Sequence, residues 1–202
     1  MSFQVKSQRL ESNGRPVTYI ESPNRGGNLR PLYLIMHYTA GGSAEGAISW
    51  FKDPRAKASA HLVIGRDGEV TQMVPFNRVA WHAGRSSWNE LEGMNSYAIG
   101  IELANAGKLR KNEQGDWVNW ASNKVPPAEV TVATHKDETT PAGWQLYTSE
   151  QLEAALGVAM ALHEAYRFLD ILGHEDVSPR RKVDPGPAFP MISFKSKVLG
   201  RQ

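Results

Sequence analysis

The sequence predicts an α/β protein in which a central mixed β-sheet is flanked by helices. Three observations point to this class. The apolar run at residues 32–39 has the length and β-prone composition of a buried central strand. Residues 60–74 carry two apolar runs around an Asp-Gly pair, which favours a hairpin. Residues 148–163 combine a capping signal with helical apolar spacing, so helices and strands occur along one chain.

The first half of the chain predicts four strands and one short helix. The strand at residues 32–39 is followed by a helix that begins with Ser43 as its N-cap. Residues 60–74 predict two strands joined by the turn Arg66-Asp67-Gly68. The apolar residues 97–105 predict a fourth strand, which we expect beside the first one in the sheet.

The second half of the chain begins with a polar stretch. Residues 106 to about 146 are rich in Gly, Pro, Asn and Lys and are too long for an ordinary connection, so we expect a functional loop or a partly mobile insertion. A long helix begins with the capping box at residues 148–151, and a last strand is predicted at 168–172. The tryptophans of the insertion either form a platform for sugar rings or anchor it to the core: Trp117, Trp120 and Trp144.

Composition limits what this chain can be. A length of 202 residues fits one domain over 1–202, with a core at about 30–192. The formal net charge of +2, with scattered basic residues, predicts no nucleic-acid partner. No apolar run is long enough for a membrane span, and residues 1–17 lack the apolar core of a signal peptide, so we expect a cytoplasmic site of synthesis. A monomer is the default expectation.

Residues 172–190 form an unusual segment with four prolines. Proline fixes φ and removes a backbone donor, so we expect neither a helix nor a central strand here but a loop of fixed shape. His174 and Asp184 lie on it, and His37 closes the first strand. Because the chain has no cysteine, any metal site must use His, Asp or Glu. Two imidazoles and one carboxylate match the catalytic type of zinc site, although the spacing alone is a weak signal.

Five sequence blocks support the interpretation of these residues as a zinc site. They are LYLIMHYTAG, ASAHLVIGRDGEV, AWHAG, NSYAIGIELAN and GHEDVSPRRKVDPGPAFP, in this order between residues 32 and 190. Together they resemble the zinc-dependent N-acetylmuramoyl-L-alanine amidase family. The resemblance implies one zinc ion per chain at one end of the sheet, held by His37, His174 and Asp184. The phage-lysozyme branch has a cysteine in place of Asp184, so the chain is more similar to the anhydromuropeptide amidases.

The resemblance also implies two catalytic residues. Glu102 falls on the acidic residue that acts as general base on the attacking water, and Lys182 on the lysine that stabilises the oxyanion. The alternative for Lys182 is one more solvated charge beside Arg180 and Arg181. The catalytic tyrosine of the phage-lysozyme branch falls on Ala60, so a tyrosine-dependent mechanism is not expected.

Six further residues are candidates for substrate binding. The resemblance places the block AWHAG at the rim of the substrate groove, although packing around a turn would also explain it. His61 either lines the pocket or is a satisfied buried histidine. Asn95 either bonds near the strand end that presents Glu102 or is an ordinary turn residue. The candidate substrate-binding residues are therefore His61, Trp81, His82, Ala83, Gly84 and Asn95.

The resemblance implies hydrolysis of the amide bond between N-acetylmuramoyl, or 1,6-anhydro-N-acetylmuramoyl, residues and L-alanine of the stem peptide, in peptidoglycan or muropeptides. One alternative is a peptidoglycan-binding module without catalysis, and another is a zinc peptidase that cuts within the stem peptide. A cytoplasmic recycling enzyme and a phage endolysin released by a holin or another route both fit the sequence. We expect the insertion at 106–146 to decide between soluble fragments and intact wall.

Overall fold

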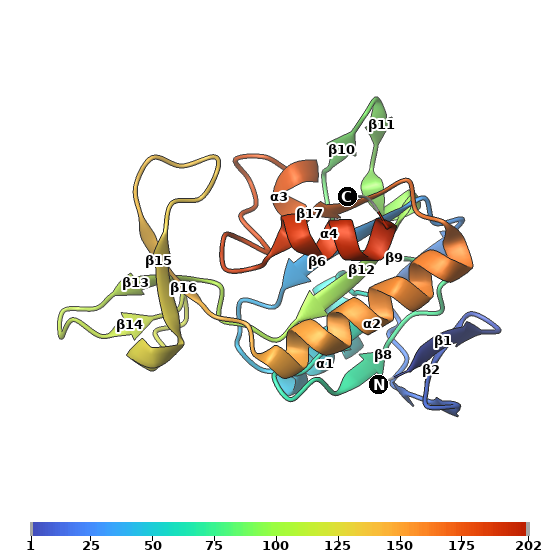
Figure 1. Cartoon of the computed structure of the whole chain (residues 1–202), viewed down its shortest axis with the longest axis horizontal. Helices are drawn as coiled ribbons and strands as arrows, with labels where there is room; N and C mark the ends of the chain where they lie inside the picture. Colours follow the sequence, from blue (N-terminus) through green and yellow to red (C-terminus); the bar gives the residue numbers. More distant parts are fainter. Residues whose placement is uncertain (1, 201–202) are drawn as a thin grey trace.

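The structure is a computed structural model that describes residues 2–200. Its central element is a six-stranded sheet with the order β17-β6-β12-β7-β8-β4 (Figure 1). The neighbours from β17 to β7 run parallel, whereas β7 and β8 pair antiparallel, so the predicted mixed sheet and α/β class are confirmed. The six strands are β4 (Thr18–Tyr19), β6 (Tyr33–Tyr38), β7 (Leu62–Ile64), β8 (Val70–Gln72), β12 (Ala98–Leu103) and β17 (Asp170–Gly173).

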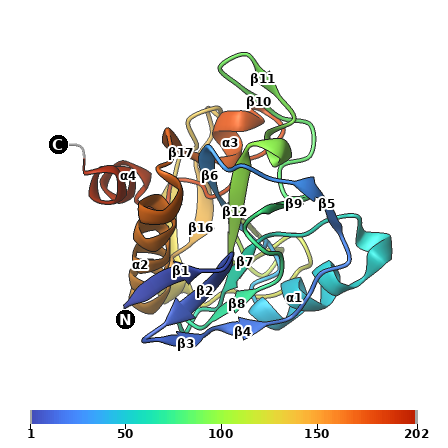
Figure 2. The ribbon, with the colours of Figure 1, turned by 90° about the vertical axis from the view of Figure 1, so that its right-hand side faces the viewer.

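Helices cover both faces of this sheet (Figure 2). The helices α2 (Ser149–Tyr166) and α4 (Met191–Leu199) lie on one face, and α1 (Ala44–Lys52) lies on the other. Side chains alternate along β6, so Leu34 and Met36 join the core with α2, while Ile35 points to the opposite face. His37 continues this alternation and therefore points to the face of Ile35.

The predicted helix starts and the predicted hairpin are confirmed. Ser43 caps α1 by accepting a hydrogen bond from the N–H of Gly46 at 3.1 Å. Thr148 and Gln151 form the capping box of α2. The turn between β7 and β8 has Gly68 at φ +81°, a left-handed conformation that favours glycine.

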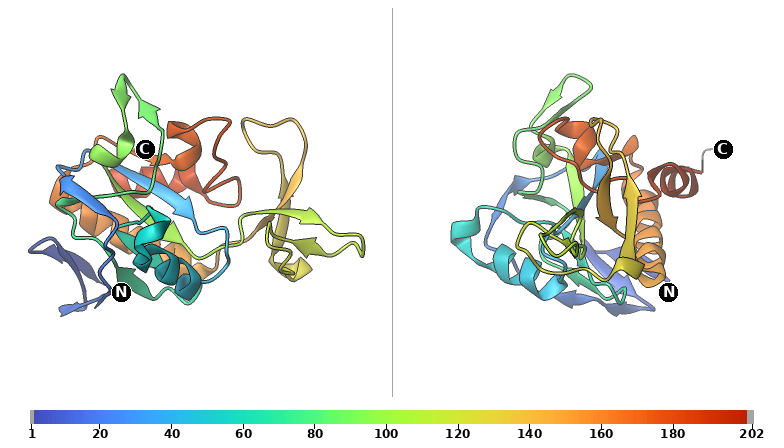
Figure 3. Two further views of the ribbon diagram at one scale, coloured as in Figure 1. Left: turned by 180° about the vertical axis from the view of Figure 1, so that it is seen from behind. Right: turned by 90° about the vertical axis from the view of Figure 1, so that its left-hand side faces the viewer.

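The insertion at 106–146 differs from the prediction, because it is largely a small sheet rather than an irregular loop. Its four strands have the order β14-β13-β16-β15 and stand beside the main body (Figures 1 and 3). The strands are short, with polar and apolar residues mixed, so the sequence carries little periodic signal. They are β13 (Lys108–Lys111), β14 (Trp117–Val118), β15 (Val130–Ala133) and β16 (Ala142–Gln145), and a 3-10 turn, η3 (Pro127–Glu129), precedes β15.

The segment at 172–190 is also more regular than expected. Its first residues end β17 and form the one-turn helix α3 (His174–Val177), so the exclusion of a helix there is wrong. The prolines begin only at Pro179, which leaves the residues before it free to take helical dihedrals. The rest of the segment, up to α4, has no helix or strand, in line with its prolines.

The remaining elements surround the sheet and were not predicted. They include a three-stranded meander near the N-terminus (β1-β2-β3), a pair of strands (β5-β9) beside β12, a projecting hairpin (β10-β11) and two 3-10 turns. Among residues 2–200, no helix combines the length and the apolar character needed to cross a membrane. These elements are β1 (Phe3–Lys6), β2 (Arg9–Ser12), β3 (Arg15–Pro16), β5 (Arg25–Asn28), β9 (Arg78–Ala80), β10 (Ser87–Trp88), β11 (Leu91–Glu92), η1 (Pro54–Ala56) and η2 (Met94–Ser96).

Candidate functional site

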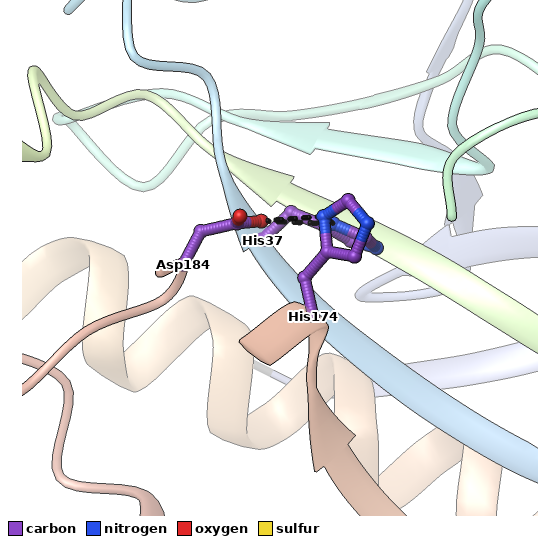
Figure 4. A group of neighbouring side chains, drawn as sticks. All are labelled: His37, His174 and Asp184. Atoms are coloured by element: carbon purple, nitrogen blue, oxygen red, sulfur yellow. Dashed lines mark hydrogen bonds and ion pairs between the residues drawn. The ribbon is translucent and has the colours of Figure 1, made fainter. Parts of the chain in front are cut away.

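Three side chains from separate elements meet at the carboxyl ends of the parallel strands. His37 comes from β6, His174 is the first residue of α3, and Asp184 lies on the loop after it (Figure 4). Nδ1 of His37 and Nδ1 of His174 are 3.0 Å apart. Oδ2 of Asp184 lies 3.1 Å from Nδ1 of His37 and 2.9 Å from Nδ1 of His174. All three residues are buried. The three predicted ligands therefore form a group that could hold a metal ion.

Packing and hydrogen bonds fix the loop that carries Asp184. The N–H of Glu175 donates to the carbonyl of Asp184 at 2.9 Å, which ties the loop to α3. The hydroxyl of Tyr147 donates to the carbonyl of Pro185 at 2.8 Å. A Cβ on Gly173 would lie 2.8 Å from Cδ of Pro185, so only glycine leaves room for this approach. The fixed path that the prolines predict is thus reinforced by contacts from distant elements.

The hydrogen-bond partners of the histidines define their tautomers. Nε2 of His174 faces the carbonyl of Ala83 at 3.1 Å, so this nitrogen carries the proton. Nε2 of His82 donates in the same way to the carbonyl of Ala98 at 3.2 Å, which leaves its Nδ1 as an acceptor. That Nδ1 receives the Nε2–H of His37 at 2.9 Å. The Nδ1 lone pairs of His37 and His174 are therefore both free and point at each other.

This electrostatic arrangement fits a cation. Burial and the neighbouring His174 lower the pKa of His37 to about 4, so its ring is neutral near pH 7. Burial alone would raise the pKa of Asp184, but the close rings of His174 and His37 hold it well below its usual range. Two nitrogen lone pairs and a carboxylate oxygen then converge without a proton between them. Such a set repels itself unless a cation lies among the donors, and two imidazoles with one carboxylate suit zinc.

Glu102 lies next to this group on β12, directly opposite His37 in the parallel pairing with β6. The predicted neighbourhood of the two residues is confirmed. Its side chain lines a cavity of about 740 Å³ that His174 and Asp184 also line. The atom Oε2 is buried and has no hydrogen-bond partner among the described residues. Burial, and then the charge of Asp184, raises the pKa of Glu102 well above its ordinary value. The raised pKa makes the carboxylate of Glu102 a stronger proton acceptor than an exposed glutamate.

Lys182 lines the same cavity from the loop between α3 and α4. Its backbone N–H donates to the carbonyl of Ser178 at 3.0 Å, which fixes the turn that presents the side chain. Its positive charge acts on Glu102, because it lowers the pKa of that carboxyl against the larger effect of burial. Within residues 2–200, the ammonium group has no ion-pair partner, so it is available to a ligand.

The block AWHAG divides into residues that line the cavity and residues that build it. Trp81 and His82 line it, whereas Ala83 and Gly84 do not. The carbonyl of Ala83 instead accepts from His174 and, at 2.8 Å, from the guanidinium of Arg181. Substrate contact by these four residues stays a prediction, and the observed contacts give His82 and Ala83 a further role in orienting the candidate ligands.

His61 and Asn95 lie outside the lining of the cavity. His61 is fully buried; its Nδ1 accepts from the N–H of Gly100 at 3.0 Å and its Nε2 donates to the carbonyl of Arg78 at 2.9 Å. Oδ1 of Asn95 accepts from the N–H of His82 at 3.0 Å, and also from that of Ala83. Their roles in substrate binding stay predictions. The contacts of His61 match the satisfied buried histidine considered for it, whereas Asn95 holds the AWHAG block rather than a local turn.

Sequence reasoning missed the support that the insertion gives to the site. His135, on the loop between β15 and β16, is 2% exposed, and its Nε2 lies 2.8 Å from Oε2 of Glu175. The same oxygen accepts from the N–H of Gly186 at 3.2 Å. The ring of Trp144 packs so closely on Gly186 that a Cβ there would lie 2.6 Å from it. No local pattern signals these contacts, because the partners are about 40 residues apart.

The three tryptophans of the insertion differ in burial and in what they contact. Trp144 is buried and packs against Gly186, so it anchors the insertion to the main body, whereas Trp117 packs against Gly143 within the insertion itself. Trp120, in contrast, is 73% exposed and lines the cavity together with Trp50 of α1. The sequence drew attention to the first of these two indoles but gave no sign of the second.

Comparisons with known proteins agree with this geometry. Residues 27–187 match the family model described as N-acetylmuramoyl-L-alanine amidase. The 1,6-anhydro-N-acetylmuramyl-L-alanine amidase AmpD of Escherichia coli is 33% identical over 144 residues, which cover 70% of this chain and 59% of that protein. AmpD of Enterobacter cloacae is 36% identical over 142 residues, 69% of this chain and 57% of that protein. The chain therefore spans less than two thirds of the length of these curated relatives.

Solved structures show the same fold. A crystal structure of a selenomethionine AmpD derivative matches with a TM-score of 0.63 and 27% identity, covering 90% of this chain and 94% of the other. A complex of the amidase AmiD from E. coli with anhydro-N-acetylmuramic acid-L-Ala-D-γ-Glu-L-Lys matches with a TM-score of 0.61 and 23% identity, covering 97% of this chain and 65% of the other.

Proposed function

The chain belongs to the N-acetylmuramoyl-L-alanine amidase family, in its anhydromuropeptide branch, and from this premise we propose its activity. It hydrolyses the amide bond between an N-acetylmuramoyl or 1,6-anhydro-N-acetylmuramoyl residue and L-alanine of the stem peptide. The single observation that carries the proposal is the buried Oε2 of Glu102, which has no partner among the described residues and lies beside the His37, His174 and Asp184 group. Glu102, His174 and Asp184 line one cavity. A binding module would have no need for such a carboxyl group, whose burial is costly.

The ligands that we assign to zinc are Nδ1 of His37, Nδ1 of His174 and Oδ2 of Asp184. A zinc ion held by these atoms would supply Lewis acidity, the chemistry that lowers the pKa of water and polarises a carbonyl group. The residues behind the ligands keep them in the required state: Ala83 holds the tautomer of His174, and His82 holds that of His37.

The other steps belong to residues of the chain. Glu102 accepts the proton of the attacking water, and its raised pKa makes it a stronger base than an exposed glutamate. The protonated Glu102 then returns this proton to the amide nitrogen, so that L-alanine leaves as an amine and the sugar product keeps a carboxylate. Lys182 stabilises the negative charge that develops on the carbonyl oxygen, since it lines the same cavity and its charge acts on Glu102.

We propose soluble muropeptides that carry the anhydro sugar as the preferred substrate, because the curated relatives AmpD of E. coli and of E. cloacae are 1,6-anhydro-N-acetylmuramyl-L-alanine amidases. The full chain, supplied with zinc, is incubated with a purified anhydro-muropeptide, and the products are identified by mass spectrometry. The expected products are an intact stem peptide and a free sugar. A shortened stem that remains attached to the sugar would favour the peptidase, and tight binding without any product would favour the binding module; either result contradicts the proposal.

A further inference from the structure

Two tryptophans of the cavity have no part in the chemistry proposed above. Trp50 lies on α1 and is 57% exposed, and Trp120 lies in the insertion and is 73% exposed. Both line the cavity that contains Glu102 and Asp184. Exposed indoles of this size in one cavity leave much apolar surface in contact with water. Their placement is therefore better explained by a ligand that covers them than by packing within the chain.

Trp120 is held in a defined position. Its Nε1–H donates to the carbonyl of Ala40 at 3.1 Å. The preceding residue, Asn119, is buried, and its Oδ1 accepts from the N–H groups of Ala121 at 3.0 Å and Asn123 at 2.9 Å. These bonds close a tight turn under the exposed ring. The indole is a fixed surface of the site and not a loose side chain.

The surface is tied directly to the catalytic end of the sheet. Ala40 follows His37 by three residues and has φ +59°, a left-handed conformation that alanine rarely adopts. This strained turn directs its carbonyl to Trp120 and leads into α1. On α1, Phe51 is buried in a small apolar cluster and Trp50 is 57% exposed, and both line the cavity. The loop that follows His37 therefore organises both indoles.

The chemistry around the indoles indicates what they bind. Ala40, whose carbonyl accepts from Trp120, carries no charge, and neither do the lining residues Gly41 and Ser43 that follow it in the chain. The cations of the cavity, Arg181 and Lys182, lie on the loop after α3 instead. An acidic stem peptide is attracted to these cations, whereas the apolar C–H face of a pyranose ring packs flat on an indole.

We propose that Trp50 and Trp120 form a sugar subsite that takes the N-acetylhexosamine ring on the glycan side of the muramoyl residue. The inference rests on the proposed function, because it names one more part of the same substrate. It also makes the insertion, through Trp120, a determinant of which fragments the enzyme prefers.

The test compares two substrates that differ only in this ring, the disaccharide tetrapeptide and the monosaccharide tetrapeptide, both with the anhydro sugar. Trp120→Ala and Trp50→Ala each raise KM for the disaccharide by about 3- to 10-fold, the effect expected of one aromatic contact, and leave kcat and the KM for the monosaccharide unchanged. Trp120→Phe restores most of the loss. Trp88→Phe, which alters an indole of the β10–β11 hairpin outside the cavity lining, serves as the matched control.

A second readout is independent of cleavage. The peptide-free disaccharide N-acetylglucosaminyl-N-acetylmuramic acid quenches tryptophan fluorescence in the wild type, and this quenching is weakened in both alanine variants. Equal KM changes for the two substrates, or none for either, would overturn the subsite. If the wild type cleaves neither substrate, the proposed function has failed, and the fluorescence titration still decides whether the two indoles bind the sugar.

Discussion

The Nε2–H of His37 donates to Nδ1 of His82 at 2.9 Å, and this bond fixes which nitrogen of His37 faces the candidate metal site. His82 is fixed in turn by the carbonyl of Ala98. His82, from the AWHAG block, thus acts on the candidate site through His37, a candidate metal ligand near the end of β6. Orienting partners of this kind typically change metal affinity by 10- to 100-fold when they are removed.

His82→Leu should therefore weaken zinc binding by about 10- to 100-fold while the fold is kept, because His37 loses the acceptor that fixes its tautomer. The affinity is measured by competition with a chromogenic chelator, without any assay of activity. His163→Gln, on α2 and outside the cavity lining, is the control. Unchanged affinity in His82→Leu would show that His82 only fills space.

Glu102→Gln should retain zinc and lose about 10²- to 10⁴-fold in kcat, since the amide cannot take the proton of the attacking water. Metal content by atomic emission and turnover of a muropeptide are measured on the same preparation. Near wild-type turnover in this variant is incompatible with the role of Glu102 as the base.

Lys182→Met should lower kcat by about 10²- to 10³-fold, as expected when one group that stabilises an oxyanion is lost. An exposed cation two residues earlier gives a matched control, since Arg180→Met removes a charge that does not line the cavity. If both variants lose activity to the same small extent, Lys182 is one more solvated charge and stabilises no oxyanion.

The buried His61 predicts a pH dependence of stability. Burial lowers its pKa from 6.5 to about 4, so between these values the unfolded chain binds a proton that the folded chain does not. The free energy of unfolding therefore falls as the pH is lowered through this window. Each differentially bound proton contributes ~1.4 kcal/mol per pH unit to the slope.

His61→Gln should reduce the slope of the free energy of unfolding against pH by up to ~1.4 kcal/mol per pH unit, because glutamine does not titrate. Its amide still offers an acceptor to the N–H of Gly100 and a donor to the carbonyl of Arg78. Urea denaturation at several pH values, in the presence of a chelator, measures the slope for both proteins. An identical slope in the variant would mean that His61 is protonated equally in the folded and unfolded chains.

The elements that carry the candidate site residues were predictable because their signals are local. The apolar run of β6 ends at His37, the Asp-Gly turn marks the β7–β8 hairpin, and the capping box of Thr148 starts α2. Parallel pairing of β6 with β12 then brings Glu102 next to His37. In each case a few neighbouring residues carry the information.

The parts that escaped prediction depend on contacts between distant residues. The strands of the insertion are short and mixed in polarity, and His135 is recognisable as a structural residue only once Glu175 is placed beside it. The orienting role of His82 likewise requires the ring of His37, 45 residues earlier. Trp50 belongs to a helix that the sequence predicted, yet its place in the cavity depends on how that helix packs.

The central claim is that water, activated at the His37, His174 and Asp184 group, cleaves the amide between the muramoyl residue and L-alanine. Cleavage in heavy-oxygen water tests it most directly, with the zinc-loaded and the chelator-treated chain run side by side. We predict one labelled oxygen in the lactyl carboxylate of the sugar product and none in the stem peptide. We also predict that the chelator-treated chain forms no product and that added zinc restores cleavage. Label in the peptide, or equal cleavage after complete removal of the metal, would contradict the account.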